Sequence, residues 1–65
     1  MINHFSTNLR NYRKQRNMTQ QDLANKLYIS RQTISAYETE IRHCDLDTLV
    51  RLSEILEVTL DELIL

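Results

Sequence analysis

Apolar residues recur at helical spacing along this chain of 65 residues. Phe5, Leu9 and Tyr12 stand at positions i, i+4 and i+7, which form one stripe of an amphipathic helix. Basic residues occupy the last turns of this segment, where they suit the negative end of the helix dipole. Asn17 follows, and asparagine tolerates the left-handed conformation that often ends a helix. The pattern predicts a first helix over about residues 5–16.

Polar caps mark the next helix boundaries, because the sequence contains neither glycine nor proline. Thr19 and Asp22 are spaced as in a capping box, and they predict a short helix over about residues 20–27. Ser30 is the expected N-cap of a third helix over about residues 31–39. The connection before this cap is so short that the two helices must cross steeply, which is the geometry of a helix-turn-helix.

The remainder of the chain predicts two more helices. Asp45 is the expected N-cap of a helix over about 46–57, and Thr59 with Glu62 forms a capping box for a helix over about 60–65. No segment alternates polar and apolar residues as a strand does. The chain is therefore predicted to be all-α, with five short helices around one core in a single domain. The buried stripe expected on the fourth helix consists of Leu46, Leu49, Leu52, Ile55 and Leu56.

The net charge of −1 hides an uneven distribution of charged residues. Residues 1–42 contain seven Lys and Arg against three Asp and Glu, a net charge of +4. Residues 43–65 contain one basic residue against six acidic residues, a net charge of −5. A basic half and an acidic half indicate that one face meets a polyanion and the other does not. The alternative is a bipolar domain whose charged faces are simply solvated.

Several classes of function lack the residues that they need. Apolar runs are too short to cross a bilayer, and the start of the chain lacks the features of a secretory signal. Cys44 has no cysteine partner, which favours the reducing cytoplasm, and redox sensing by this thiol is a less favoured alternative. His4 and His43 do not stand at metal-site spacing, and no residues group into a nucleophile with its base. We therefore expect no metal, cofactor, small-molecule ligand, membrane contact or enzymatic activity.

The second and third predicted helices carry a recognisable set of residues. They are Gln20, Leu23, Ala24, Leu27, Ile29, the segment Ser30–Ser35, Tyr37 and Glu38. Ala24 is small where the two helices approach most closely, and the apolar residues around it fix the angle between them. This segment resembles the helix-turn-helix of the Cro and phage-repressor type, also called the Xre type. With its flanks the resemblance covers about residues 5–64. It implies a compact lambda-repressor-like DNA-binding domain, and an ordinary helical hairpin is the alternative.

The resemblance implies which residues contact bases. In such motifs the N-terminal residues of the recognition helix reach base edges, and here these residues are Arg31 and Gln32. Arginine pairs with guanine and glutamine with adenine in the major groove. Ser35 and Ala36 continue the same exposed face, and Ala36 can touch a thymine methyl group. A positive charge is unfavourable at the positive N-terminal end of a helix dipole, so helix stability does not explain an arginine at position 31. A solvated first-turn charge is the alternative.

Other positions are candidates for phosphate contacts or for support of the recognition helix. The start of the second helix presents unpaired amide groups to a phosphate. In some relatives a pair equivalent to Arg13 and Glu38 bridges the first helix and the recognition helix, and two separate surface charges are the alternative. The phosphate candidates are Gln20, Ser30, Thr33, Arg10 and Arg42, each of which has an ordinary surface residue as its alternative.

The chain departs from the family at positions where glycine is usual. These positions are Asn17, Tyr28 and Glu40. If the turn keeps the family's shape, Tyr28 adopts a positive φ, which is costly for a bulky residue. Glu40 brings a negative charge into a loop that approaches the nucleic-acid backbone in the family. Arg42 is then the one cation left in that loop.

Together these features predict a sequence-specific, double-stranded DNA-binding transcriptional regulator, a small repressor of the bacterial, phage or plasmid type. We expect a cytoplasmic, nucleoid-associated homodimer that binds a roughly palindromic operator. Leu60 and the apolar C-terminal residues 63–65 are the expected self-association surface, with packing onto the other helices as the alternative. The alternative function is a protein-interaction module, such as an antitoxin or accessory factor, which Glu40 and Ile41 favour.

Overall fold

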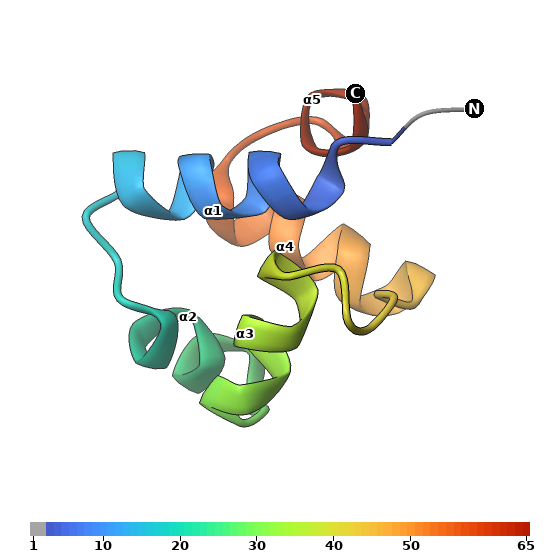
Figure 1. The fold of residues 1–65 in the computed structure, drawn as a ribbon. Coiled ribbons are helices and arrows are strands. Elements are labelled where there is room, and N and C mark those ends of the chain that lie inside the picture. The colour runs from blue at the N-terminus through green and yellow to red at the C-terminus, as the bar shows by residue number, and fades with distance from the viewer. Residues whose placement is uncertain (1–2) are drawn as a thin grey trace.

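A computed structural model describes residues 3–65 and contains five helices, with no strand in that range (Figure 1). The all-α fold of five helices is as expected from the sequence, and every helix ends within a residue or two of its expected boundary. The helices are α1 (Phe5–Gln15), α2 (Gln20–Leu27), α3 (Arg31–Glu38), α4 (Leu46–Leu56) and α5 (Leu60–Ile64).

Capping hydrogen bonds fix where most of the helices begin. In α2 the Thr19 hydroxyl accepts from the Asp22 amide at 3.0 Å, and the Asp22 carboxylate accepts from the Thr19 amide at 2.9 Å. The same reciprocal pair joins Thr59 and Glu62 at the start of α5. Asp45 is the N-cap residue of α4, as expected, but its side chain makes no capping hydrogen bond. The sequence therefore predicts the start of α4 correctly, but the side-chain capping hydrogen bond expected of Asp45 does not form.

The core takes apolar side chains from all five helices. Fully buried residues include Leu9 of α1, Ile34 of α3 and Leu52 of α4. Most of the stripe expected on α4 faces this core, but Leu46 is 69 % exposed. It is the first residue of α4, and Figure 1 shows that this end of the helix extends beyond the helices that it packs against. The expected burial of Leu46 was therefore wrong, because no neighbouring helix covers this end of α4.

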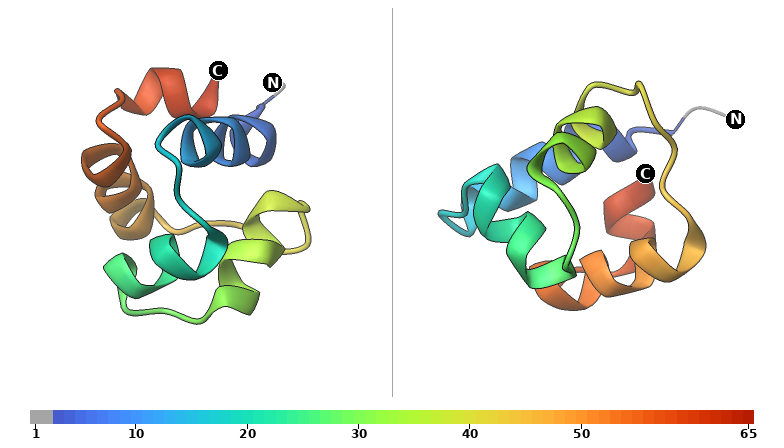
Figure 2. Two further views of the ribbon diagram at one scale, coloured as in Figure 1. Left: turned by 90° about the vertical axis from the view of Figure 1, so that its left-hand side faces the viewer. Right: turned by 90° about the horizontal axis from the view of Figure 1, so that it is seen from below.

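Polar contacts attach α5 to the first helix. The Asn8 side-chain amide donates to the carbonyl oxygens of Glu62 and Leu63 at 3.2 and 3.1 Å. The His4 amide donates to the Ile64 carbonyl oxygen at 2.8 Å. These bonds satisfy carbonyl groups near the C-terminal end of α5, which have no partner inside so short a helix. The start of α1 and the end of α5 therefore lie side by side (Figure 2).

Within residues 3–65, four non-glycine residues adopt the left-handed conformation that glycine usually takes. Asn17, Tyr28, Glu40 and Glu57 have φ values of 57°, 58°, 63° and 58°. The positive φ expected for Tyr28 is confirmed, whereas nothing in the sequence pointed to Glu57. A left-handed residue lets the chain turn sharply after a helix, so these side chains stand at the connections between the five helices.

Candidate nucleic-acid interface

The second and third helices form a tightly connected pair with α3 at the edge of the molecule (Figure 2). Ala24 is fully buried in the core that these helices share. The Ile29 amide donates to the Ala24 carbonyl oxygen at 3.1 Å, and the Tyr28 amide donates to Asn25 at 3.3 Å. These bonds close the turn immediately before Ser30, the N-cap of α3. The two helices therefore meet at one defined angle.

The third helix has one buried side and one outward side. Ile34 and Tyr37 are buried in the core. Arg31 and Gln32 are exposed, while Ser35 and Ala36 are half-buried. At 100° per residue these last four positions fall on one side of the helix, opposite Ile34 and Tyr37. The structure thus brings the four candidate base-contact residues onto one outward strip.

The N-terminus of α3 is capped in a way that leaves amide groups available. The Ser30 hydroxyl accepts from the Thr33 amide at 3.2 Å and lies 2.9 Å from the Thr33 hydroxyl oxygen. Arg31 and Gln32 are the first two helical residues, so their amides have no partner within the helix. This end of α3 combines a basic side chain, a hydroxyl pair and positive amide dipoles. Such a combination suits negatively charged ligands.

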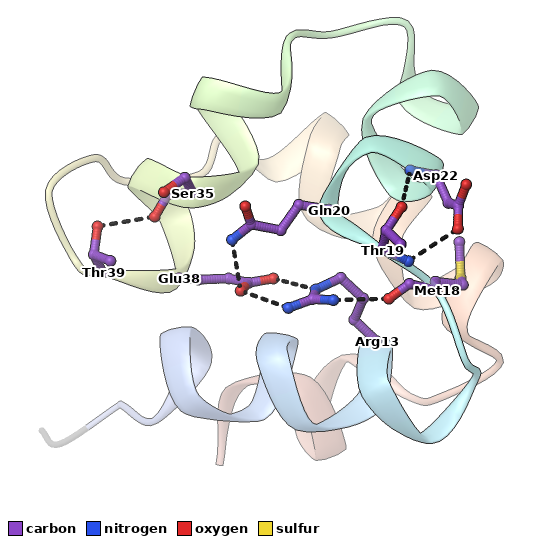
Figure 3. A network of polar contacts seen from close by, with 8 residues as sticks. All are labelled: Arg13, Met18, Thr19, Gln20, Asp22, Ser35, Glu38 and Thr39. Carbon is purple, nitrogen blue, oxygen red and sulfur yellow. Dashed lines mark hydrogen bonds and ion pairs between the residues drawn. The ribbon is translucent and has the colours of Figure 1, made fainter.

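A buried ion pair connects α1 to the end of α3 (Figure 3). Arg13 Nε lies 2.7 Å from Glu38 Oε2, and Arg13 Nη2 lies 3.1 Å from Glu38 Oε1. The two side chains are only 9 % and 2 % exposed. Arg13 Nη1 also donates to the Met18 carbonyl oxygen at 2.7 Å. The structure therefore excludes the alternative of two separate surface charges.

The Gln20 side chain belongs to this network, which sequence reasoning did not anticipate. Its Nε2 atom donates to Glu38 Oε1 at 3.2 Å (Figure 3). Gln20 is the first residue of α2 and is half-buried. One hydrogen of its amide group is thus used inside the protein, and the second remains for another acceptor. No spacing rule in the sequence pairs the start of α2 with the last residue of α3.

The remaining phosphate candidates lie on either side of this network. Arg10 is exposed and lies one helical turn after Ser6 and one turn before Arg13. Both of these residues contact α3, so Arg10 lies beside the face of α1 that packs against α3. Arg42 is exposed in the loop after α3, and its amide donates to the Ala36 carbonyl oxygen at 3.3 Å. The half-buried Thr33 and the exposed Ser30 lie at the opposite end of α3.

Two acidic residues lie close to these candidates. The hydrogen bonds from the Thr19 backbone and hydroxyl lower the pKa of Asp22, so this side chain is negatively charged at the start of α2. Glu40 is exposed and follows α3 in the left-handed conformation. Both charges oppose a phosphate, so the positive character of the interface lies mainly at Arg10, Arg31 and Arg42.

Other kinds of site have less support. Within residues 3–65, no three His, Cys, Asp or Glu side chains stand close enough to hold a metal ion. No helix in that part of the chain is long and apolar enough to cross a membrane. Burial raises the pKa of the Cys44 thiol to about 11, so it carries very little of the reactive thiolate at neutral pH.

Comparison with known proteins identifies the same fold and its family. A family model described as helix-turn-helix, HTH_3, matches residues 9–63. An uncharacterized HTH-type transcriptional regulator of Bacillus subtilis, YqaE, is 48 % identical over 60 residues, which is 92 % of this chain and 52 % of YqaE. The HTH-type transcriptional activator BcrR of Enterococcus faecalis is 37 % identical over 92 % of this chain and 29 % of BcrR. The chain thus spans about half the length of YqaE and less of BcrR.

Solved structures show the same fold. A transcriptional regulator from Listeria innocua superposes with a TM-score of 0.91 at 23 % identity, over 98 % of this chain and 60 % of that one. The biofilm regulator SinR, solved in complex with DNA, superposes with a TM-score of 0.83 at 22 % identity, over 91 % and 95 % of the two chains. The fold and the outward α3 define a helix-turn-helix domain. This chain belongs to the Xre/Cro-like helix-turn-helix family of DNA-binding transcriptional regulators.

Proposed function

We propose that this protein is a sequence-specific regulator that reads double-stranded DNA with α3. The carrying observation is the position of Arg31 and Gln32, which are exposed at the start of a helix whose opposite side is anchored in the core. An α-helix with its side chains is about 10–12 Å in diameter, and a B-DNA major groove is about 12 Å wide. The start of α3 therefore fits into the groove without distortion of the domain.

Each residue of the outward strip has chemistry suited to base edges. Arg31 offers two parallel donors to guanine O6 and N7, and Gln32 offers a donor and an acceptor to adenine. Ser35 donates or accepts, and Ala36 presents a methyl group to thymine. All four lie on one side of α3, so they address neighbouring bases in one groove. We assign sequence preference to these four residues.

Contacts to the DNA phosphate backbone hold the domain in register on the duplex. We assign these contacts to Gln20 with the first amides of α2, to Ser30 and Thr33 at the start of α3, and to Arg10 and Arg42. Phosphate contacts of this kind carry no base information, and those from charged residues make binding depend on salt. We assign no DNA contact to the Arg13–Glu38 pair, which orients α3 by holding Glu38 against Arg13 of α1 and Gln20 of α2.

We further propose that two copies bind one operator. The molecule measures 30 × 24 × 20 Å, so two copies side by side can place their α3 helices about 34 Å apart, one turn of DNA. Exposed apolar side chains on α4, at the start of α5 and at the C-terminal residue supply a self-association surface. The exposed residues are Leu46, Val50, Leu60 and Leu65. Leu63, which was expected on this surface from the sequence, is fully buried in the core, and Ile64 is half-buried, so that part of the expectation was wrong.

Steric exclusion of RNA polymerase requires only a bound helix-turn-helix domain, so we propose repression in the cytoplasm without enzymatic activity. BcrR, a relative, is named as an activator. Reporter expression from an operator placed over or upstream of a promoter distinguishes the two outcomes. Lower expression from the overlapping operator supports repression, whereas higher expression from the upstream operator supports activation.

Selection of bound sequences from a pool of random duplexes tests the proposal. We expect a symmetric motif with half-sites one turn apart. Arg31→Ala and Gln32→Ala should relax the preference at single positions of that motif, with a cost of about 1–3 kcal/mol each. Arg42→Ala should weaken binding to every sequence alike and lower the salt slope by about one. Equal effects of all three changes on every duplex contradict the residue assignment.

A protein-interaction module is the second candidate function. The loop after α3 favours it, because Ile41 is 81 % exposed and Glu40 opposes a phosphate. Titration with random duplex DNA at about 50 and 200 mM salt separates the two functions. Affinity that falls steeply with salt supports the DNA-binding proposal, whereas the absence of binding at both salt concentrations favours a protein partner.

A further inference from the structure

The Tyr28 side chain is large but contributes little buried apolar surface to the fold. Of the large apolar side chains in residues 3–65 it is the most exposed, at 90 %. Its backbone has φ 58° and ψ 40°, a left-handed conformation that a bulky residue adopts only at a cost. Its side chain is therefore available to a partner outside the domain.

The other three left-handed residues do not expose a large apolar side chain. Asparagine tolerates this conformation, so Asn17 needs no special reason. Glu40 and Glu57 carry charged side chains, which are normally exposed to water. A tyrosine combines an apolar ring with a polar hydroxyl, and such side chains are favoured where one part is covered and the other is hydrogen-bonded. Among the four, Tyr28 alone exposes a ring.

The position of Tyr28 places it beside the proposed DNA-reading helix. It is two residues before Ser30, the N-cap of α3, so the two Cα atoms are at most about 7 Å apart. The hydrogen bonds from the amides of Tyr28 and Ile29 to the end of α2 hold the turn in place. When the start of α3 enters a groove about 12 Å wide, this turn lies at the edge of the groove, where the phosphates of one strand run.

We propose that Tyr28 is an additional contact to the DNA backbone. Its ring packs against a deoxyribose, and its Oη atom donates a hydrogen bond to a phosphate oxygen at the edge of the half-site. This inference rests on the proposed function of α3. A tyrosine is neutral, so the contact releases no condensed cation, and a sugar-phosphate contact carries no base information. Tyr28 should therefore increase affinity without changing sequence preference or salt dependence.

Fluorescence anisotropy with two labelled duplexes tests this signature. One duplex carries the selected motif and the other a random sequence, at salt concentrations between about 50 and 200 mM. Tyr28→Phe removes the hydroxyl and keeps the ring, so we expect binding to both duplexes to weaken by a similar factor of about ten. The slope of affinity against salt and the melting temperature should stay at their wild-type values. Arg42→Ala, in contrast, should lower that slope by about one.

Tyr28→Gly and a matched control separate the contact from the backbone strain. Tyr28→Gly relieves the left-handed conformation and removes the whole side chain, so the melting temperature should rise while DNA affinity falls further than in Tyr28→Phe. Glu57→Gly relieves the same conformation after α4. It should also raise the melting temperature, and its loss of a negative charge can only favour DNA binding. Relief of strain therefore cannot imitate the expected loss of affinity.

Each result bears on the inference separately from the proposed function. If wild-type protein binds DNA in a salt-dependent way and both Tyr28 variants bind as tightly as wild type, the backbone contact is refuted and the proposed function stands. A change of preferred motif in Tyr28→Phe also overturns it, because that result indicates a base contact. If wild-type protein binds neither duplex at either salt concentration, the proposed function fails and this inference fails with it.

Discussion

Glu38→Gln is the substitution that tests most directly how α3 is held. The Glu38 carboxylate accepts three hydrogen bonds, from Arg13 Nε at 2.7 Å, Arg13 Nη2 at 3.1 Å and Gln20 Nε2 at 3.2 Å. Glutamine has nearly the same shape but no charge, and one of its two end atoms is a donor. The change therefore leaves the buried Arg13 guanidinium without a counter-charge and sets one donor against another.

The expected cost is large compared with the stability of the domain. Removing one partner of a buried ion pair typically destabilises by about 3–5 kcal/mol. At roughly 0.05–0.15 kcal/mol per residue, 65 residues give a free energy of unfolding of about 3–10 kcal/mol. Glu38→Gln should therefore remove about half of the stability. Replacing both partners, as in Arg13→Met with Glu38→Leu, should cost far less, because no unpaired charge is then buried.

Urea unfolding followed by circular dichroism at neutral pH measures these differences. Arg10→Met is the matched control, because Arg10 is exposed on the same helix, and it should change stability by no more than about 0.5 kcal/mol. The reasoning is refuted if Glu38→Gln costs less than about 1 kcal/mol, which is typical of an exposed pair. It is also refuted if the loss of unfolding free energy in the double variant equals the sum of the losses in Arg13→Met and Glu38→Leu alone, because coupled partners are not additive.

Further predictions concern the caps, the thiol and the effect of acid. Thr59→Ala removes the cap of α5 and should lower the free energy of unfolding by about 1 kcal/mol, measured by urea unfolding; no change would show that the cap is dispensable. Cys44, with a pKa of about 11, should react with a disulfide reagent at pH 8 far more slowly in folded protein than in urea, and equal rates contradict its burial. The pKa of Asp22 is lowered by its Thr19 hydrogen bonds, so this contact stabilises the fold above about pH 4 and is lost as the pH falls through the folded pKa. Asp22→Asn should flatten that part of the stability–pH curve, and an unchanged curve contradicts the assignment.

Much of the fold follows from the sequence because caps and periodic apolar residues act over short distances. Thr19 with Asp22 and Thr59 with Glu62 make the same reciprocal bonds that their spacing predicts. The exposure of Leu46 was not predictable in this way. Periodicity gives the direction of a side chain on its own helix, but it does not say where the neighbouring helices end.

The candidate site likewise contains features that the sequence predicts and features that it does not. The placement of Arg31 and Gln32 on an outward strip follows from the period of α3 and the buried Ile34, so it was within reach of sequence reasoning. The bond from Gln20 to Glu38 was not, because it joins residues 18 positions apart on two helices. It depends on the crossing angle of α2 and α3, which only the packed structure fixes.

Charge distribution gives the domain a preferred orientation toward DNA. The helices α1, α2 and α3 lie within the part of the chain whose net charge is +4, whereas α4 and α5 lie within the part whose net charge is −5. A polyanion attracts the first part and repels the second, so long-range electrostatics turn α3 toward the duplex before any specific contact forms. Steering of this kind accelerates association and weakens with salt, whereas the base contacts that we propose for Gln32 and Ser35 would form only after docking. Glu54→Gln, which removes one exposed negative charge from α4, should therefore leave sequence preference intact and raise mainly the rate of association, measured by stopped-flow fluorescence.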